Sequence, residues 1–191
     1  MLTAKRPDRH ARRGFTLIEL MTVVIIVAVL ATLAVYAVRK YVWSAKTTEA
    51  YQMINSIRSA QEAYRAETFA YCNVSNGCQA GGDLTARWPN VDPGRKASWQ
   101  DSSCGDPQCQ GFRTLGVSPN GPVFFRYSSV AGTGAPSAPG TPATGFSLPT
   151  ADTGPWYVVQ ALGDQNEDKQ VFSVFLASNL TSDVYAENDT E

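Results

Sequence analysis

The feature that most constrains this chain is an uncharged apolar run of 19 residues, Leu20 to Val38. As a helix it spans roughly 28 Å at about 1.5 Å per residue, which matches the hydrocarbon core of a bilayer. The basic residues before the run outnumber Arg39, Lys40 and Lys46 after it. The positive-inside rule therefore places the N-terminus in the cytoplasm and the bulk of the chain outside.

The charges of the chain are unevenly distributed. The 191 residues carry a net charge of −1, but residues 1–14 hold five basic residues and one acidic residue. The remainder therefore has eleven basic and sixteen acidic residues, a net charge of −5. Nucleic-acid binding requires Lys and Arg that neutralise phosphates, so we expect no nucleic-acid partner.

Two ordinary kinds of N-terminal segment compete as explanations of the apolar run. A secretory signal peptide has a shorter apolar region followed by a small-residue cleavage site. A simple signal anchor is the stronger alternative, but here the basic leader stops abruptly at Gly14, and Glu19 lies at the start of the apolar region. A carboxylate in a membrane segment is costly, which marks Glu19 as a functional residue in need of a partner.

The stretch Arg12-Arg13-Gly14-Phe15-Thr16-Leu17-Ile18-Glu19-Leu20-Met21 precedes the rest of the apolar run. It resembles the signature of type IV prepilins, of the type IVa class, and of type II secretion pseudopilins. The resemblance implies that prepilin peptidase cuts between Gly14 and Phe15 and that the new amine of Phe15 is methylated. It also implies that Glu19 neutralises the N-terminal amine of a neighbouring subunit during assembly.

The resemblance divides the chain into three parts. Residues 1–14 are the leader peptide, and residues 15–41 are the transmembrane half of a long helix, which also forms the filament core. Residues 42–191 are a periplasmic or extracellular globular domain that includes the second half of the helix. Pilins often have a proline within the apolar helix, whereas this chain has none between Pro7 and Pro89. This departure favours a minor or specialised subunit.

The fold class follows from the patterns beyond the apolar run. We expect the helix to continue to about Phe69, because apolar residues recur at steps of three and four with charged residues between them: Ala50, Met53, Ile54, Ile57, Ala60 and Tyr64. Strands are expected at Val123–Val130, Trp156–Leu162 and Val171–Ala177, with a short one near Val184 and Tyr185. The sequence therefore predicts an α+β pilin fold, in which the second half of the helix packs on a small antiparallel sheet.

Two segments are rich in turn-forming residues. Residues 72–121 are expected to form few strands and to have little apolar core of their own. Residues 131–155, heavy in Gly, Pro, Ser, Thr and Ala, are expected to form a mobile surface loop.

Four cysteines lie beyond the apolar run: Cys72, Cys78, Cys104 and Cys109. An even count in a region expected to be exported indicates two disulfides. The first expectation pairs each cysteine with its neighbour in sequence, and cross-pairing stays open. A zinc site is less favoured, because the spacings do not suit it and the only histidine, His10, lies in the leader.

The segment between the second and third predicted strands is acidic. Asp164, Asn166 and Asp168 alternate as in a calcium loop, but Lys169 and Phe175 replace the glycine and the acid that such loops use next. Some pilins and pseudopilins carry a similar acidic turn, and some of those bind calcium. A solvated turn is the favoured interpretation, so no cofactor is expected and calcium is the alternative.

The expected function is structural. No nucleophile–base pair is visible, and His10 lies outside the exported part, so we do not expect an enzyme. The first hypothesis is a major or minor type IV pilus subunit serving motility, adhesion or DNA uptake. The second is a type II secretion pseudopilin, and a weaker third is a membrane-anchored adhesin or sensor that does not polymerise. The expected partners are prepilin peptidase and other pilin subunits, first in the inner membrane and then in a filament.

Overall fold

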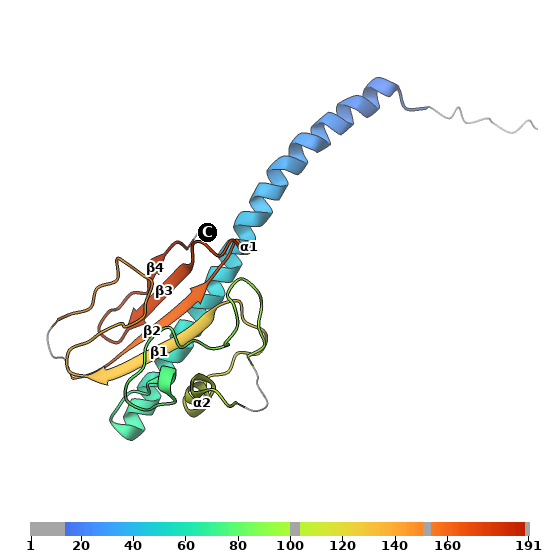
Figure 1. Ribbon diagram of the computed structural model, residues 1–191. Coiled ribbons are helices and arrows are strands. Elements are labelled where there is room, and N and C mark those ends of the chain that lie inside the picture. The colour runs from blue at the N-terminus through green and yellow to red at the C-terminus, as the bar shows by residue number, and fades with distance from the viewer. Residues whose placement is uncertain (1–13, 100–103, 151–153, 190–191) are drawn as a thin grey trace, which may run out of the picture. The chain divides into compact units, whose positions relative to one another are not determined.

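A computed structural model describes residues 14–99, 104–150 and 154–189. Within them the chain forms one long helix, two short helical segments and four strands (Figure 1). This architecture confirms the predicted α+β pilin-like fold class. The chain divides into two compact units, Met1–Tyr41 and Val42–Glu191. Apart from Gly14, the predicted leader lies outside the described residues.

Helix α1 runs without interruption from Leu17 to Thr68. Its 52 residues include no proline or glycine, the two residue types that most disfavour a helix interior. The helix ends where Phe69 takes a left-handed backbone conformation, with φ of 59°, and donates its N–H to the carbonyl of Arg65 at 2.9 Å. The end predicted near Phe69 is therefore confirmed.

The four described strands form one antiparallel sheet in the order β1-β2-β3-β4. Their bounds are β1 Arg126–Thr133, β2 Pro155–Gly163, β3 Ser173–Ser178 and β4 Tyr185–Glu187. All four predicted strands are present at slightly shifted positions. The first begins later than predicted because Val123 instead exchanges two backbone hydrogen bonds with Ala97.

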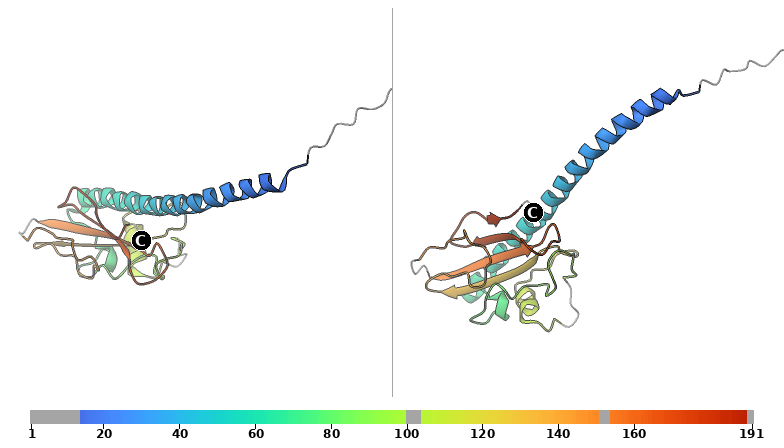
Figure 2. Two further views of the ribbon diagram at one scale, coloured as in Figure 1. Left: turned by 90° about the horizontal axis from the view of Figure 1, so that it is seen from above. Right: turned by 45° about the horizontal axis from the view of Figure 1, so that its top comes forward.

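The main core lies between one face of the sheet and the second half of α1, within the unit Val42–Glu191 (Figure 2). Alternate residues of β2, including Tyr157 and Val159, face the helix, where Ile54 and Ile57 are fully buried. The predicted apolar stripe of α1 is thus the buried face, with Ala60 and Tyr64 only partly buried.

The opposite face of the sheet is also covered. The intervening residues of β2, Trp156, Val158 and Leu162, form a second apolar cluster. Phe146 and Leu148 pack against this cluster from the segment that was expected to be a surface loop. That expectation was incomplete, because part of the segment serves as a covering layer. Burial on both faces explains why the central strands are almost continuously apolar.

The segment between helix and sheet contains two short helical pieces, η1 Val74–Asn76 and α2 Pro107–Thr114. A Cβ placed on Gly111 of α2 would lie 2.8 Å from the backbone of Val74, so only glycine lets the two pieces approach this closely. The expectation of little apolar core here was wrong, since the main cluster includes these side chains of the segment: Trp88, Trp99, Phe112, Leu115 and Val117.

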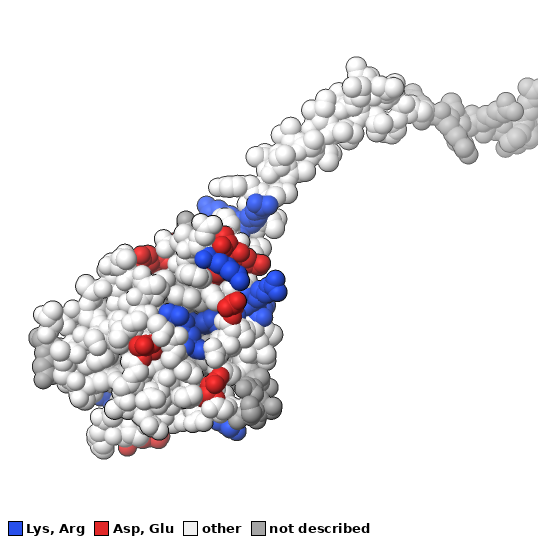
Figure 3. All heavy atoms as spheres, in the orientation of Figure 1, with Lys and Arg blue, Asp and Glu red and all other residues white. Residues whose placement is uncertain are grey.

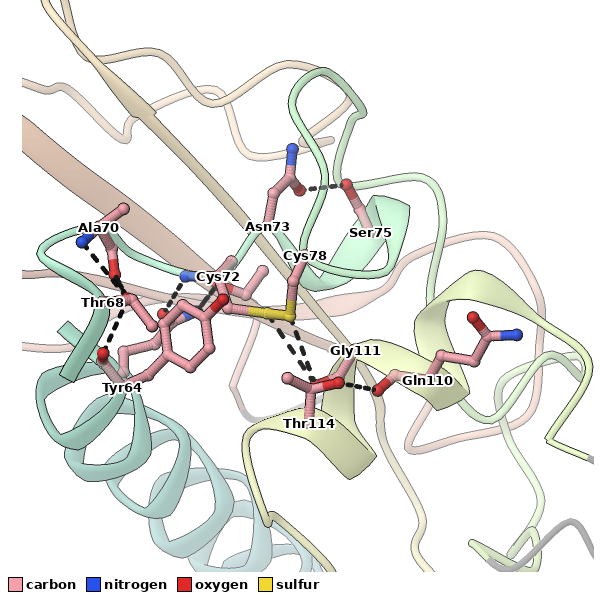
Figure 4. The surroundings of a disulfide bond; sticks show 12 residues. Tyr64, Thr68, Ala70, Cys72, Asn73, Ser75, Cys78, Gln110, Gly111 and Thr114 are labelled. Carbon is pink, nitrogen blue, oxygen red and sulfur yellow. Dashed lines mark hydrogen bonds between the residues drawn. A yellow bond between two sulfur atoms is a disulfide. The ribbon is translucent and has the colours of Figure 1, made fainter.

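Disulfides join Cys72 to Cys78 and Cys104 to Cys109, which is the local pairing and not the cross-pairing. The first bond lies beside α2, with both sulfur atoms 4.0 Å from the carbonyl oxygen of Gly111 (Figure 4). The second bond holds the start of α2. Together the bonds fix a region that has almost no regular secondary structure.

Candidate functional site

The first unit presents an exposed apolar helix. Every residue from Phe15 to Tyr41 is exposed, and Phe15 and Leu17 expose 85% and 77% of their surfaces. The most apolar 18-residue window of α1 has a mean hydropathy of 2.7, and none of it is buried. Most of this helix is uncoloured on the face shown in Figure 3, where charged side chains gather on the second unit. Its length and composition suit a membrane crossing, and so large an apolar surface requires lipid or other apolar helices as its cover.

The hydroxyl groups within this helix are compatible with an apolar environment. Thr22 Oγ1 donates to the carbonyl of Glu19 at 3.0 Å, and Thr32 Oγ1 donates to the carbonyl of Val29 at 2.7 Å. Each hydroxyl therefore donates its hydrogen to a carbonyl of its own helix and needs no partner outside it. Glu19 is the only ionisable side chain of α1 before Tyr36.

Glu19 closes the start of α1 by a reciprocal cap. The carboxylate oxygen Oε2 of Glu19 accepts hydrogen bonds from the backbone N–H of Thr16 at 2.8 Å and from its hydroxyl at 2.7 Å. The N–H of Glu19 donates to Thr16 Oγ1 at 3.3 Å. This is a capping box, and the spacing of Thr16 and Glu19 before an apolar run is a sequence signature for it. This role of Thr16 was not predicted from the sequence.

The cap leaves part of the carboxylate free. Within the described residues, no hydrogen bond to Oε1 of Glu19 is present. The two bonds to Thr16, the residue that follows Phe15, hold the side chain at the N-terminal end of the helix. The group is therefore a positioned anion that can accept hydrogen bonds from one further cation, such as an amine.

The fold itself does not require glycine at position 14. A Cβ added to Gly14 would meet no atom within 4 Å, and the residue is exposed. Any restriction on the size of this side chain must therefore come from outside the chain. Gly14, Phe15 and Glu19 are brought within one short exposed segment, and their predicted roles in processing and assembly stay predictions.

The three candidate calcium residues lie in the β2–β3 turn and bind one another and the backbone. Asp164 is fully buried and accepts from the N–H groups of Glu167 at 2.7 Å and Lys169 at 2.9 Å. Asn166 Nδ2 donates to Asp168 at 3.1 Å. In the described part of the chain, no group of three or more His, Cys, Asp or Glu side chains is placed to hold a metal. Calcium binding stays an untested alternative.

A cavity of about 620 Å³ adjoins the same turn, between it and residues 91–98. Arg126 forms part of its wall, and burial of its guanidinium lowers the pKa of this side chain. The guanidinium donates to backbone carbonyls only, those of Val91, Asp92, Arg95, Phe124 and Phe125. Its donors are thus occupied in shaping the loop and are not available to a ligand.

Two charged residues of α1 hold the helix to the segments that flank β1 and β2. Glu49 Oε1 accepts from the N–H of Phe124 at 2.6 Å. Lys46 Nζ lies 3.9 Å from the centre of the Phe124 ring and donates to the carbonyl of Gln165 at 2.9 Å. Burial of the ammonium lowers the pKa of Lys46. The residues that looked like spacers between apolar positions therefore fix the register of helix on sheet.

Comparison with known proteins connects the exposed helix to one family of motifs. Residues 9–35 match the family model of the prokaryotic N-terminal methylation motif. The chain is also similar to the type II secretion system core protein G of Pseudomonas aeruginosa strain PAO1, with 40% identity over 73 residues. These residues are 38% of this chain and 51% of the relative, so the match spans about half the length of that protein. No solved structure matches the chain.

The family match confirms the resemblance carried by residues 12–21. The chain has a prepilin-type N-terminal methylation motif, followed by a single long apolar helix compatible with a single-pass anchor in the inner membrane.

Proposed function

We propose that this protein is a subunit of a pilin-like filament, released from the membrane and assembled through packing of its N-terminal helix. The observation that carries the proposal is a methylation motif on a helix whose apolar surface is exposed from Phe15 onward, with one positioned carboxylate, Glu19. A helix of this kind is stable in lipid or among copies of itself, and a filament core supplies the second environment.

Processing is the first step of the proposed function. Prepilin peptidase cuts after Gly14, which removes the basic leader and leaves a free amine on Phe15, and that amine is then methylated. Removal of five basic residues lowers the cost of withdrawing the helix from the bilayer, because charged groups are expensive to bury in hydrocarbon. Before assembly the subunit is a single-pass inner-membrane protein with its N-terminus in the cytoplasm.

Assembly uses the complementary charges at the start of the helix. The amine of one subunit pairs with the carboxylate of Glu19 in a neighbour, at the oxygen that the cap leaves free. In an apolar core an unpaired charge costs far more than a paired one. A subunit placed out of register therefore leaves two charges unpaired, which gives the filament a unique axial step.

The similarity to core protein G favours a type II secretion pseudopilus as the machine that uses this subunit. In that machine a short filament would push substrates outward from the periplasm. A type IV pilus subunit, minor or major, is the second candidate, favoured by the same methylation motif.

Deletion of the chain distinguishes the two machines. We expect a loss of folded exoproteins from the culture supernatant, with surface filaments unaffected, restored by the wild-type chain and not by Glu19→Ala. Loss of sheared surface filaments with normal secretion would favour the pilus. If both secretion and surface filaments are unchanged, the proposal is contradicted.

A further inference from the structure

Phe69, at the C-terminal end of α1, combines two unfavourable properties. It is 85% exposed, the greatest fraction for a large hydrophobic side chain in the described part of the unit Val42–Glu191, where Val42 and Val91 are exposed to 43% and 54%. Its backbone is left-handed, with φ of 59°, a conformation that normally selects glycine or asparagine at the end of a helix. Glycine or asparagine would satisfy both the backbone and the solvent better than phenylalanine does.

The backbone at Phe69 is held by its neighbours. The N–H of Phe69 donates to the carbonyl of Arg65 at 2.9 Å and closes the last turn. Thr68 Oγ1 lies 2.8 Å from the carbonyl oxygen of Tyr64 and 2.9 Å from that of Ala70, which share its one proton, so residues on both sides are held (Figure 4). The side chain therefore projects from a helix end whose backbone is already ordered, which lowers the entropic cost of binding.

Exposed charges near Phe69 on α1 are those of Glu62, Arg65 and Glu67, of which Glu62 and Arg65 are hydrogen-bonded to the hydroxyl of Tyr71. A cavity of about 260 Å³ begins at the next residue, Ala70, and its lining is uncharged. Beside these charges, one strip of the exposed surface of α1 that ends near Phe69 is uncharged and mostly small, whereas the solvent face of a helix is normally charged. The residues of this strip, spaced by three and four, are Gln52, Asn55, Ser56, Ser59, Ala63 and Ala66.

We propose that Phe69 is an anchor residue for a second copy of this chain. The proposal rests on the proposed function, because a filament of like subunits must cover the exposed face of α1 with a neighbour. An uncharged strip of small side chains allows a neighbour of equally neutral character to approach closely. An exposed aromatic ring on the ordered backbone at its end then supplies the contact area typical of an interface hot spot.

This role makes opposite predictions for the free and the assembled protein. In Phe69→Gly the full chain in detergent should melt at an unchanged or higher temperature, because glycine relieves the left-handed backbone and no buried contact is lost. The same variant should reduce the filament fraction in cells about tenfold or more. The matched control is Glu167→Gly, which replaces an exposed, polar residue with φ of 64° and should leave assembly unchanged.

Two outcomes overturn the proposal. One is a Phe69→Gly chain that assembles as the wild type does. The other is a melting temperature that falls together with assembly, which would make Phe69 a residue of the fold itself. Failure of the wild-type chain to enter any filament would instead contradict the proposed function, so the two failures are distinguishable.

The occupant is identified by a photo-reactive benzoylphenylalanine at position 69 of the full chain in cells. Adducts with the mass of two copies of this chain are expected, and they should disappear in Glu19→Ala, which cannot assemble. An adduct formed only with a different protein overturns the assignment of a second copy.

Discussion

The side-chain amide of Gln61 binds both backbone polar groups of Cys72. Gln61 Nε2 donates to the Cys72 carbonyl at 2.7 Å, and the Cys72 N–H donates to Gln61 Oε1 at 2.9 Å. The same Nε2 lies 3.1 Å from Ser129 Oγ of β1, and Gln61 is fully buried. One side chain therefore ties the helix, the first disulfide and the sheet together.

Gln61→Leu should destabilise the fold, because it leaves the buried N–H and carbonyl of Cys72 without partners. We expect the free energy of unfolding to fall by about 2–3 kcal/mol. The measurement is urea denaturation of the full chain in detergent with disulfides intact. The control is Gln52→Leu on the exposed face of α1, which should change the free energy by less than about 0.5 kcal/mol. Equal effects of the two changes would contradict the role of Gln61.

Three variants at the start of α1 separate the charge of Glu19 from its capping role. Glu19→Gln keeps an oxygen acceptor for Thr16 but removes the charge, and Thr16→Ala removes half of the cap but keeps the charge. We expect Glu19→Ala and Glu19→Gln to insert in the membrane and to lose most filament incorporation, whereas Thr16→Ala assembles. Fractionation of membranes and filaments measures both steps. Normal assembly of Glu19→Gln would refute the pairing of charges.

Tyr127 should make the fold sensitive to alkaline pH. Burial, followed by the nearby carboxylate of Glu49, raises the pKa of Tyr127 well above its ordinary value of 10.0. The unfolded phenol ionises near pH 10 while the folded one stays protonated, so stability is constant below pH 10 and falls above it. In melting temperatures between pH 8 and 11, Tyr127→Phe should show a smaller decline than the wild type. Lys46 acts in the opposite direction, because its lowered pKa makes stability rise with pH, and the comparison of the two proteins cancels this contribution. Parallel curves of melting temperature against pH for the wild type and Tyr127→Phe would contradict the prediction.

Calcium should not stabilise the β2–β3 turn. The oxygens of Asp164 already accept from the N–H groups of Glu167 and Lys169, and Asp168 Oδ1 accepts from Gln170 N–H at 2.8 Å. The turn is therefore already held by its own backbone donors, so binding of a metal would add little to its stability. We expect no change in melting temperature on titration with calcium. A rise that disappears in Asp168→Asn would show that the turn is a calcium site.

The parts of the fold that follow a local period were predictable from sequence. The helix from Leu17 to Thr68 follows from continuous helical residues and a stripe at steps of three and four, and the strands follow from short runs of aromatic and β-branched residues. The helix α2, Pro107–Thr114, was not predicted. Its eight residues are mostly polar and include Gly111, and its position depends on a disulfide and on close contact with Val74, which no local pattern encodes.

The sequence predicted which residues form the candidate site but not the contacts that hold them. Gly14, Phe15 and Glu19 were found from the resemblance to prepilins, and the capping of the helix by Thr16 and Glu19 was missed although its spacing is present in the sequence. Buried polar residues are harder to predict. Gln61 and Arg126 have types that are usually exposed, and their burial becomes reasonable only when distant backbone groups are brought to them by the fold.

The central claim is that a cut after Gly14 produces a new N-terminus that pairs with Glu19 of a neighbour. The most direct test is the intact mass of the native protein extracted from membranes, with Gly14→Trp as the uncut control. We predict a chain that begins at Phe15, carries one added methyl group and lacks four hydrogens because of its two disulfides. A native protein that retains Met1 and has no added methyl group would contradict the account.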